Sequence, residues 1–163
     1  MRVLGIDPGT ARFGFGIIDC DDTYTAIAYG AIETKPSMAM ADRLLILYDE
    51  LKRLFETWRP ESMAIEQLFF SRNVTTAIAV GQARGVAMLA AAQAGVEVIE
   101  YTPAEVKQAI SGYGNADKQQ VQAMVQILLT LDETPHPDDA ADALAVALCH
   151  GQSHAFAERV AGR

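Results

Sequence analysis

Four acidic residues lie at positions where a carboxylate would be buried and would need a cation as partner. Asp7 ends an apolar run and precedes a Pro-Gly turn, and Glu66 ends a second apolar run. Asp139 and Asp142 are three residues apart, so they share one face of a helix. Because an unpaired carboxylate is costly to bury, these four residues are the first candidates for chemistry.

Each acid also has an ordinary structural explanation. Asp7 could cap the turn that follows it, and the helix dipole favours acids such as Asp138 and Asp139 in a first turn. Asp142 fits the dipole explanation less well, because an apolar segment that would bury the helix follows it directly. The choice depends on whether the acids converge in space.

Convergence of the acids would create a metal site. If the strands ending at Asp7 and Glu66 are adjacent and parallel, the two residues lie about one strand spacing, roughly 4.8 Å, apart. Three or four carboxylates at that distance cannot all stay ionised without a cation. Oxygen ligands favour Mg²⁺ or Mn²⁺ over zinc. Two such ions could activate a water molecule and hold a phosphodiester for in-line displacement.

The rest of the chain is expected to form an α/β fold. Residues 12–19 alternate as a strand does, and Gly14 and Gly16 leave one face flat for close packing. The first three strands follow one another with short turns, which predicts an antiparallel meander, whereas residues 62–101 predict a parallel strand-helix-strand crossover. We expect strands at residues 3–7, 12–19, 24–34, 62–67 and 96–101, and helices at 40–58, 74–94, 103–112, 115–131 and 139–150.

The bulk composition predicts one domain at residues 1–152, followed by a frayed tail at 153–163. Cys20 and Cys149 have no metal-binding or redox spacing, so we expect reduced thiols. We find no signal-peptide pattern and no run of about 20 apolar residues, and therefore expect a cytoplasmic protein. The net charge of -8 disfavours nucleic-acid binding unless part of it forms a cation-binding cluster.

Basic residues could still gather on one face and bind DNA, in a way that would be sensitive to salt. They are Arg12, Arg43, Lys52, Arg53, Arg72, Arg84, Lys107 and Lys118.

Four segments together resemble a known family over essentially the whole chain. They are Leu4-Gly5-Ile6-Asp7-Pro8-Gly9-Thr10, Ala64-Ile65-Glu66-Gln67-Leu68-Phe69, Gly81-Gln82-Ala83-Arg84-Gly85-Val86-Ala87 and Asp139-Ala140-Ala141-Asp142-Ala143-Leu144-Ala145. In this order they are highly specific and are similar to the RuvC-type Holliday junction resolvases of bacteria.

The resemblance implies an RNase H-like fold, in which a mixed five-stranded sheet is flanked by helices, and a homodimer. It implies Mg²⁺-dependent paired nicks that resolve a four-way DNA junction into two duplexes during recombination and repair. Asp7, Glu66, Asp139 and Asp142 match the family's four catalytic acids, although some relatives have a histidine at the position of Asp139. We expect two ions per site, with Mn²⁺ able to substitute, and a branch-migration motor as partner.

Further residues match family positions that contact DNA. Phe69 matches an aromatic used at the junction crossover, where its ring could stack on an unpaired base, and Arg72 follows it in a polar loop. Lys107 and Lys118 match basic positions near the scissile phosphate. The alternatives are a core aromatic and solvated lysines. The histidines match no catalytic position, namely His136, His150 and His154.

The helix at residues 74–94 is the predicted dimer interface. Its small and flexible residues fall at spacings of three and four, although the same residues could seat the helix on the sheet. They are Ala77, Gly81, Arg84, Gly85 and Met88.

Other functions start from the same motifs. The Asp-x-Gly-Thr turn after a strand also resembles the phosphate loop of sugar kinases and actin-like ATPases, but those need two domains around a cleft. The smaller YqgF-like nucleases share the fold and a similar opening, but fit the stretch from Gly81 to Ala87 less well. A catalytically silent junction-binding module is disfavoured by the full set of acids.

Overall fold

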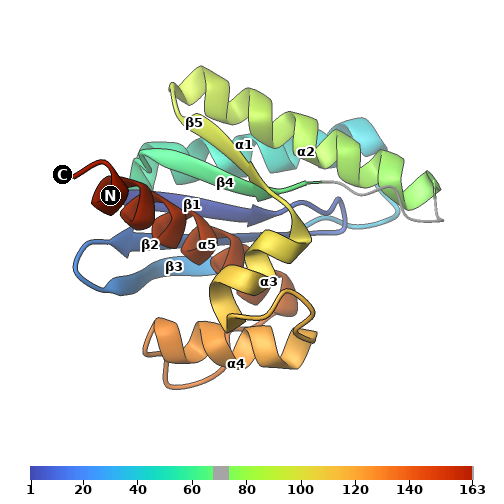
Figure 1. Ribbon diagram of the computed structural model, residues 1–163. Coiled ribbons are helices and arrows are strands. Elements are labelled where there is room, and N and C mark those ends of the chain that lie inside the picture. The colour runs from blue at the N-terminus through green and yellow to red at the C-terminus, as the bar shows by residue number, and fades with distance from the viewer. Residues whose placement is uncertain (68–73, 163) are drawn as a thin grey trace.

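The computed structural model describes residues 1–67 and 74–162. Its strands form one mixed sheet in the order β3-β2-β1-β4-β5 (Figure 1). The strands are β1 (Arg2–Asp7), β2 (Arg12–Cys20), β3 (Tyr24–Glu33), β4 (Ser62–Glu66) and β5 (Glu97–Tyr101). The helices are α1 (Met40–Trp58), α2 (Val74–Ala94), α3 (Pro103–Ser111), α4 (Lys118–Leu128) and α5 (Asp138–Val160).

The strand pairing confirms the predicted topology. β1, β2 and β3 form an antiparallel meander, and β4 and β5 pair in parallel across α2. β1 and β4 are also parallel neighbours, with Ile6 opposite Ile65. The next residue on each strand is acidic, so this register brings Asp7 and Glu66 to the same edge of the sheet.

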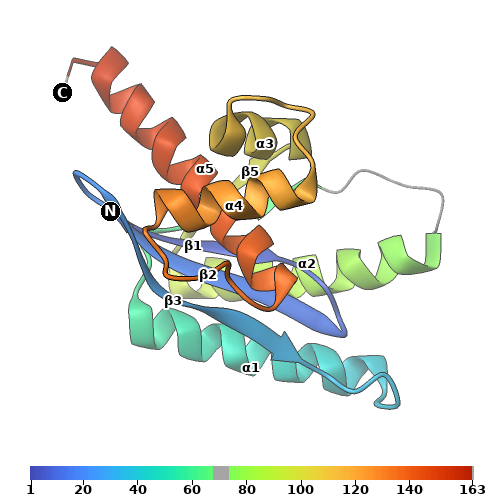
Figure 2. The same cartoon turned by 90° about the horizontal axis from the view of Figure 1, so that it is seen from below.

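The sheet lies between two groups of helices. α1 and α2 cover one face, and α3, α4 and α5 cover the other (Figures 1 and 2). Leu4 and Ile6 of β1 face the first group, while Val3 on the same strand faces the second. This alternation gives a core on each side of the sheet, and the face with α5 carries the second pair of acids.

Glycines let α5 lie directly on the sheet. A Cβ atom at Gly5 would overlap the carbonyl oxygen of Ala143, and one at Gly14 would overlap the carbonyl oxygen of Asp139. A side chain at Gly16 would meet Leu144. The flat glycine face predicted for β2 is confirmed, and it sets the distance of the α5 backbone from β1 and β2.

Two helices differ from their predicted bounds. α4 begins at Lys118, because Asp117 rather than Asn115 forms its capping box with Gln120. It ends at Leu128 rather than near residue 131, since Thr130 has a φ of 52°.

α5 runs to Val160 rather than ending at His150, so most of the expected frayed tail is helical. Gly151 does not interrupt this helix. It packs against Cys20, where a Cβ atom would be too close. Beyond it, the Ser153 hydroxyl donates to the Cys149 carbonyl.

The two cysteines are free thiols, as predicted. Within residues 1–67 and 74–162, each helix is too short or too polar to cross a membrane.

Candidate active site

Asp7 and Glu66 lie side by side because they end neighbouring parallel strands. Burial is the largest influence on Asp7, and the charges of Asp142, Asp139 and Glu66 add to it, so that the pKa of Asp7 rises to about 7. Burial and the charge of Asp142 also raise the pKa of Glu66. Both carboxylates are therefore held in surroundings that disfavour their ionised forms.

α5 brings the other two acids to the same place. Its first turn crosses β2 at Gly14, which puts Asp139 and Asp142 near Asp7. Burial raises the pKa of Asp142, although Lys118 opposes the shift. The charges of the other three predicted acids therefore all act on Asp7, as expected if the four converge.

Two lysines border the acids. The Lys118 ammonium lies 3.0 Å from Asp142 Oδ2 and 3.3 Å from Asp138 Oδ2. The charge of Lys107 partly offsets the rise in the pKa of Glu66. Glu66, Asp142 and both lysines line one cleft of about 210 Å³. The structure therefore places Lys107 and Lys118 beside the acids, where a phosphate could lie.

Arg12 is a further residue of the site, although the sequence predicts it only as one of several basic residues that could bind DNA. Its Nη1 lies 3.5 Å from Asp139 Oδ2, and its Nε lies 3.4 Å from Glu33 Oε1. Arg12 follows the turn after Asp7, so its closeness to β1 could have been read from the sequence. Its contact with Asp139 of α5 could not have been read from the sequence, because Arg12 and Asp139 are 127 positions apart.

Arg84 does not have the position expected of it. It was expected among exposed basic residues and at a dimer interface, but its side chain is buried against the sheet. Its Nη1 donates to the carbonyl oxygen of Glu66, and its Nη2 lies 2.6 Å from Glu100 Oε2. Arg43 is also buried, which removes a second residue from the expected basic face.

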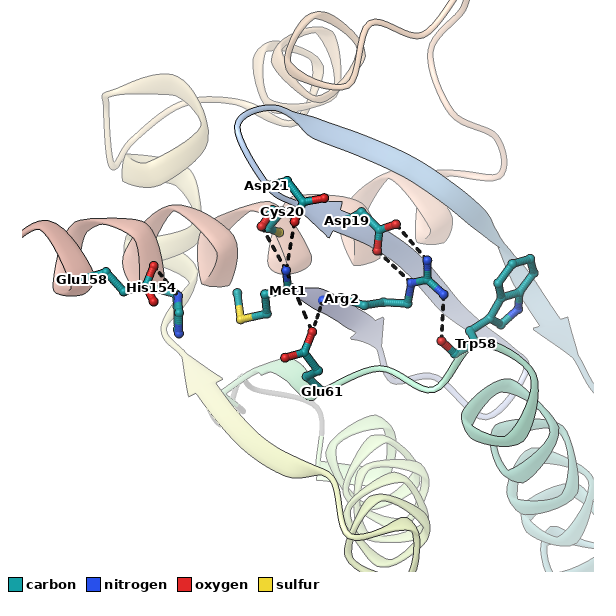
Figure 3. Close-up of polar contacts among 9 residues, drawn as sticks. All are labelled: Met1, Arg2, Asp19, Cys20, Asp21, Trp58, Glu61, His154 and Glu158. Atoms are coloured by element: carbon teal, nitrogen blue, oxygen red, sulfur yellow. Dashed lines mark hydrogen bonds and ion pairs between the residues drawn. The ribbon is translucent and has the colours of Figure 1, made fainter. Parts of the chain in front are cut away.

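Phe69 and Arg72 lie outside the described residues, so their predicted contacts with DNA stay predictions. Two histidines contact residues outside the group of four acids. His150 Nδ1 lies 2.8 Å from the Tyr101 hydroxyl, and His154 lies 3.7 Å from Glu158 on α5 (Figure 3).

The donor set fits a hard divalent cation. Four carboxylates supply only oxygen ligands, and the pKa values of three of them are raised. A cation among them would relieve this repulsion. As the side chains stand, no group of three or more acidic, histidine or cysteine side chains in the described part of the chain is arranged to hold an ion. One of the carboxylates, Asp142, is instead paired with Lys118.

Comparisons with known proteins address the family directly. The family model described as Crossover junction endodeoxyribonuclease RuvC matches residues 3–150. The chain belongs to the RuvC family. It is 55% identical to RuvC of Heliobacterium modesticaldum over 154 residues, which cover 94% of this chain and 95% of the relative. It is 52% identical to RuvC of Ruminiclostridium cellulolyticum over 155 residues, covering 94% and 93%.

Solved structures agree with this assignment. Thermus thermophilus RuvC in complex with its Holliday junction substrate matches at a TM-score of 0.92 and 36% identity, covering 96% of each chain. A second structure of that protein matches at a TM-score of 0.90 and 35% identity, covering 96% of this chain and 97% of the other. The predicted RNase H-like resolvase fold is thereby confirmed, and the RuvC family is favoured over the YqgF-like and kinase-like alternatives.

Proposed function

We propose that this protein is a structure-specific endonuclease that resolves four-way DNA junctions by paired, symmetric nicks in recombination and repair. The observation that carries the proposal is the convergence of Asp7, Glu66, Asp139 and Asp142 beside two lysines in a member of the RuvC family. Thermus thermophilus RuvC, which has the same fold, has been solved with a Holliday junction. A DNA substrate and two free cysteines support the cytoplasmic location expected from the sequence.

The four acids would hold Mg²⁺, or Mn²⁺ in its place, with two ions per site. Bound ions of this kind supply Lewis acidity, lower the pKa of a bound water and stabilise a leaving oxygen. The protein's own contribution is to fix the oxygen ligands and to hold the substrate. Lys107 and Lys118 border the cleft from α3 and α4. Their ammonium groups would contact phosphate oxygens near the scissile bond.

Lys118 has a second role in this proposal. In the structure its ammonium neutralises Asp142 at 3.0 Å. When Asp142 binds a cation, the ammonium would be free to turn to the DNA backbone. The same lysine thus stabilises the acids of the free protein and contacts the substrate.

Paired nicks require two active sites related by a two-fold axis, and each chain supplies one. We propose a homodimer formed through the exposed face of α2. Ile78 and Leu89 are 59% and 54% exposed, and a Cβ atom at Gly85 would meet open space. Gly85 belongs to the predicted set, whereas Ile78 and Leu89 are new to it and Arg84 leaves it because its side chain is buried. A branch-migration motor as a further partner stays a prediction from the family resemblance.

The interface can be tested separately from the chemistry. We expect Leu89→Glu to give a folded monomer by light scattering and to lose paired cutting, since a charge would be buried at the two-fold axis. Glu50→Gln on the exposed side of α1 is the matched control. A wild-type protein that is monomeric at micromolar concentration yet makes paired cuts would contradict the dimer.

The function is tested with a synthetic four-way junction incubated with Mg²⁺, with Mn²⁺ and with a chelator. The expected result is metal-dependent cutting at symmetry-related positions in two strands of like polarity, with linear duplex of the same sequence left intact. Uncut junction in both metals, or equal cutting of the linear duplex, would contradict the proposal.

A further inference from the structure

Two arginines inside the molecule are not explained by DNA contact or by surface ion pairs. Arg43 on α1 and Arg84 on α2 are only 8% and 9% exposed. A buried guanidinium is costly unless its hydrogen bonds are satisfied, so the partners of these two side chains indicate what they do. Arg84 contacts the backbone of an acid of the active site directly, and Arg43 is linked through one side chain to the loop that follows another.

Arg84 holds the end of β4. One nitrogen of its guanidinium donates to the carbonyl oxygen of Glu66, and another lies 2.6 Å from Glu100 Oε2 on β5. The next amide, that of Gln67, donates to the Tyr101 carbonyl at 2.7 Å. The backbone at Glu66 is therefore fixed both from the helix layer and from the neighbouring strand.

This arrangement leaves the carboxylate of Glu66 available. The Glu100 carboxylate compensates the charge of Arg84, and Arg84 contacts the carbonyl oxygen of Glu66 and not its carboxylate. Arg84 therefore fixes the backbone from which the Glu66 side chain extends, without neutralising its carboxylate. Lys118 differs, because it contacts the carboxylate of Asp142 itself.

Arg43 acts on the loop after β1 through one intermediate side chain. Its Nε donates to the Thr34 hydroxyl at 2.8 Å, and that hydroxyl donates to the carbonyl oxygen of Thr10. The hydroxyl proton must point to Thr10, since a lone pair of the same oxygen accepts from Arg43. The Thr34 amide also donates to the Ala11 carbonyl at 3.1 Å. The turn that begins at Asp7 is thereby tied to α1.

We propose that Arg43 and Arg84 are positioning residues of the active site: Arg84 fixes the backbone at Glu66 and Arg43 fixes the loop after Asp7, while both acids stay free to bind a cation. The inference rests on the proposed metal-dependent function. Arginine suits this role because its planar fork bonds several acceptors in fixed directions, which lysine cannot do. Two neighbouring acids are thus held from the two helices that cover the other face of the sheet.

The test uses Arg84→Lys and Arg43→Lys, which keep the charge and remove the fork. A misplacement of about 1 Å can cost about 100-fold in rate, so a smaller displacement of a ligand should cost about 10-fold to 100-fold. We expect kcat on the four-way junction to fall by about that factor, with junction affinity within about twofold of wild type. The Mn²⁺ affinity of the free protein, measured by calorimetry, should fall several-fold. Arg53→Lys is the matched control, because Arg53 pairs only with Glu50 on the exposed side of α1 among the described residues.

A second pair of variants keeps the test decisive if the arginine variants do not fold. Thr34→Val removes the hydroxyl that links Arg43 to the loop, and Thr34→Ser restores it. We expect the valine variant to lose both kcat and Mn²⁺ affinity and the serine variant to recover most of both. A purely structural role would lower the melting temperature and leave these two quantities unchanged in protein that is still folded.

The outcomes separate the inference from the proposed function. Wild-type metal affinity and kcat in the Arg43, Arg84 and Thr34→Val variants would overturn the inference. Loss of junction binding with unchanged metal affinity would overturn it as well, because the arginines would then act on DNA. A wild-type protein that binds Mn²⁺ but leaves junctions uncut would contradict the proposed function alone, and the calorimetry would still decide the inference.

Discussion

At the two ends of β1, the pKa values of the nearby acidic side chains are shifted in opposite directions. At the first end, Asp19 of β2 accepts two hydrogen bonds from the Arg2 guanidinium, at 2.7 and 2.8 Å, and Arg2 also donates to the Trp58 carbonyl (Figure 3). These hydrogen bonds lower the pKa of Asp19. At the other end, burial and neighbouring acids raise the pKa of Asp7 to about 7. β1 thus carries at one end Arg2, which neutralises Asp19 of β2, and at the other end Asp7, which is crowded by other acids (a frustrated acid).

The difference shows which acids stabilise the fold and which serve the site. An acid bonded to an arginine lowers the free energy of the folded state, whereas an acid crowded by other acids raises it. Four carboxylates meet near the ends of β1 and β4 and the first turns of α5, and the cation that we propose to bind there would relieve their repulsion. Perturbed carboxylates of this kind are typical of functional sites.

The largest effect on junction cleavage should come from removing one of the acids that are crowded by other acids. Asp7→Asn should lower junction cleavage by about 1,000-fold or more while junction binding is kept, because it removes a metal ligand and leaves the shape nearly unchanged. Glu66→Gln and Asp142→Asn should behave alike. Gel assays of cutting and of binding measure the two quantities separately. If Asp7→Asn lost folding and binding together, Asp7 would be a structural turn cap instead.

The second comparison is the pH dependence of stability without metal. The folded-state pKa of Asp7 is raised from 3.8 to about 7, so its stabilising contribution is present below pH 4 and is lost as the pH rises to 7. Asp7→Asn should therefore be more stable than wild type at pH 8, by about 4 kcal/mol, with little difference at pH 4. Urea unfolding in the presence of a chelator measures this. Equal stability at pH 8 would show that Asp7 is not frustrated.

Asp19 should respond in the opposite direction. Asp19→Asn removes the Arg2 ion pair and should cost about 1 kcal/mol at neutral pH, with cleavage unchanged. The pKa of Asp19 is lowered in the folded state, so its contribution is present above pH 4 and lost as the pH falls through that lowered pKa. The cost of the substitution should therefore vanish in acid. A loss of cleavage in Asp19→Asn would break the contrast between the two ends.

The smallest effect is expected at Asp138. It precedes Asp139 and contacts Lys118 at 3.3 Å, but it is exposed and outside the set of four acids. Asp138→Asn should change cleavage by no more than about twofold, because Lys118 keeps its closer contact with Asp142. Single-turnover cleavage rates provide the comparison. Loss of cleavage in this variant would mean that the wrong acids of α5 have been assigned to the metal.

The candidate acids could be predicted because their positions are local features of the sequence. Asp7 and Glu66 each end an apolar run, and the parallel pairing of β1 with β4 brings the two ends to one edge of the sheet. Gly14 predicted that another element would pack closely on β2, and that element is α5. Local features of the sequence were therefore enough to predict the position of the site and most of the sheet.

The supporting contacts could not be predicted because their partners are distant in sequence. Arg84 was placed at an interface, since nothing near it in sequence shows that it reaches Glu66, 18 residues away. Arg12 and Asp139 are 127 residues apart. The α4 boundary was wrong for a different reason. Asn115 and Asp117 are both good caps, and only the capping box of Asp117 with Gln120 decides between them.

The central claim is that the frustrated acids at the end of β1 are a cation site, and Mg²⁺-dependent unfolding tests it most directly. Thermal unfolding of wild type, Asp7→Asn and Asp19→Asn is followed with and without Mg²⁺ at pH 7.5. Saturating Mg²⁺ at about 100 times its dissociation constant should stabilise wild type and Asp19→Asn by about 2.7 kcal/mol and leave Asp7→Asn nearly unchanged. Equal Mg²⁺ stabilisation of Asp7→Asn and wild type would contradict the claim.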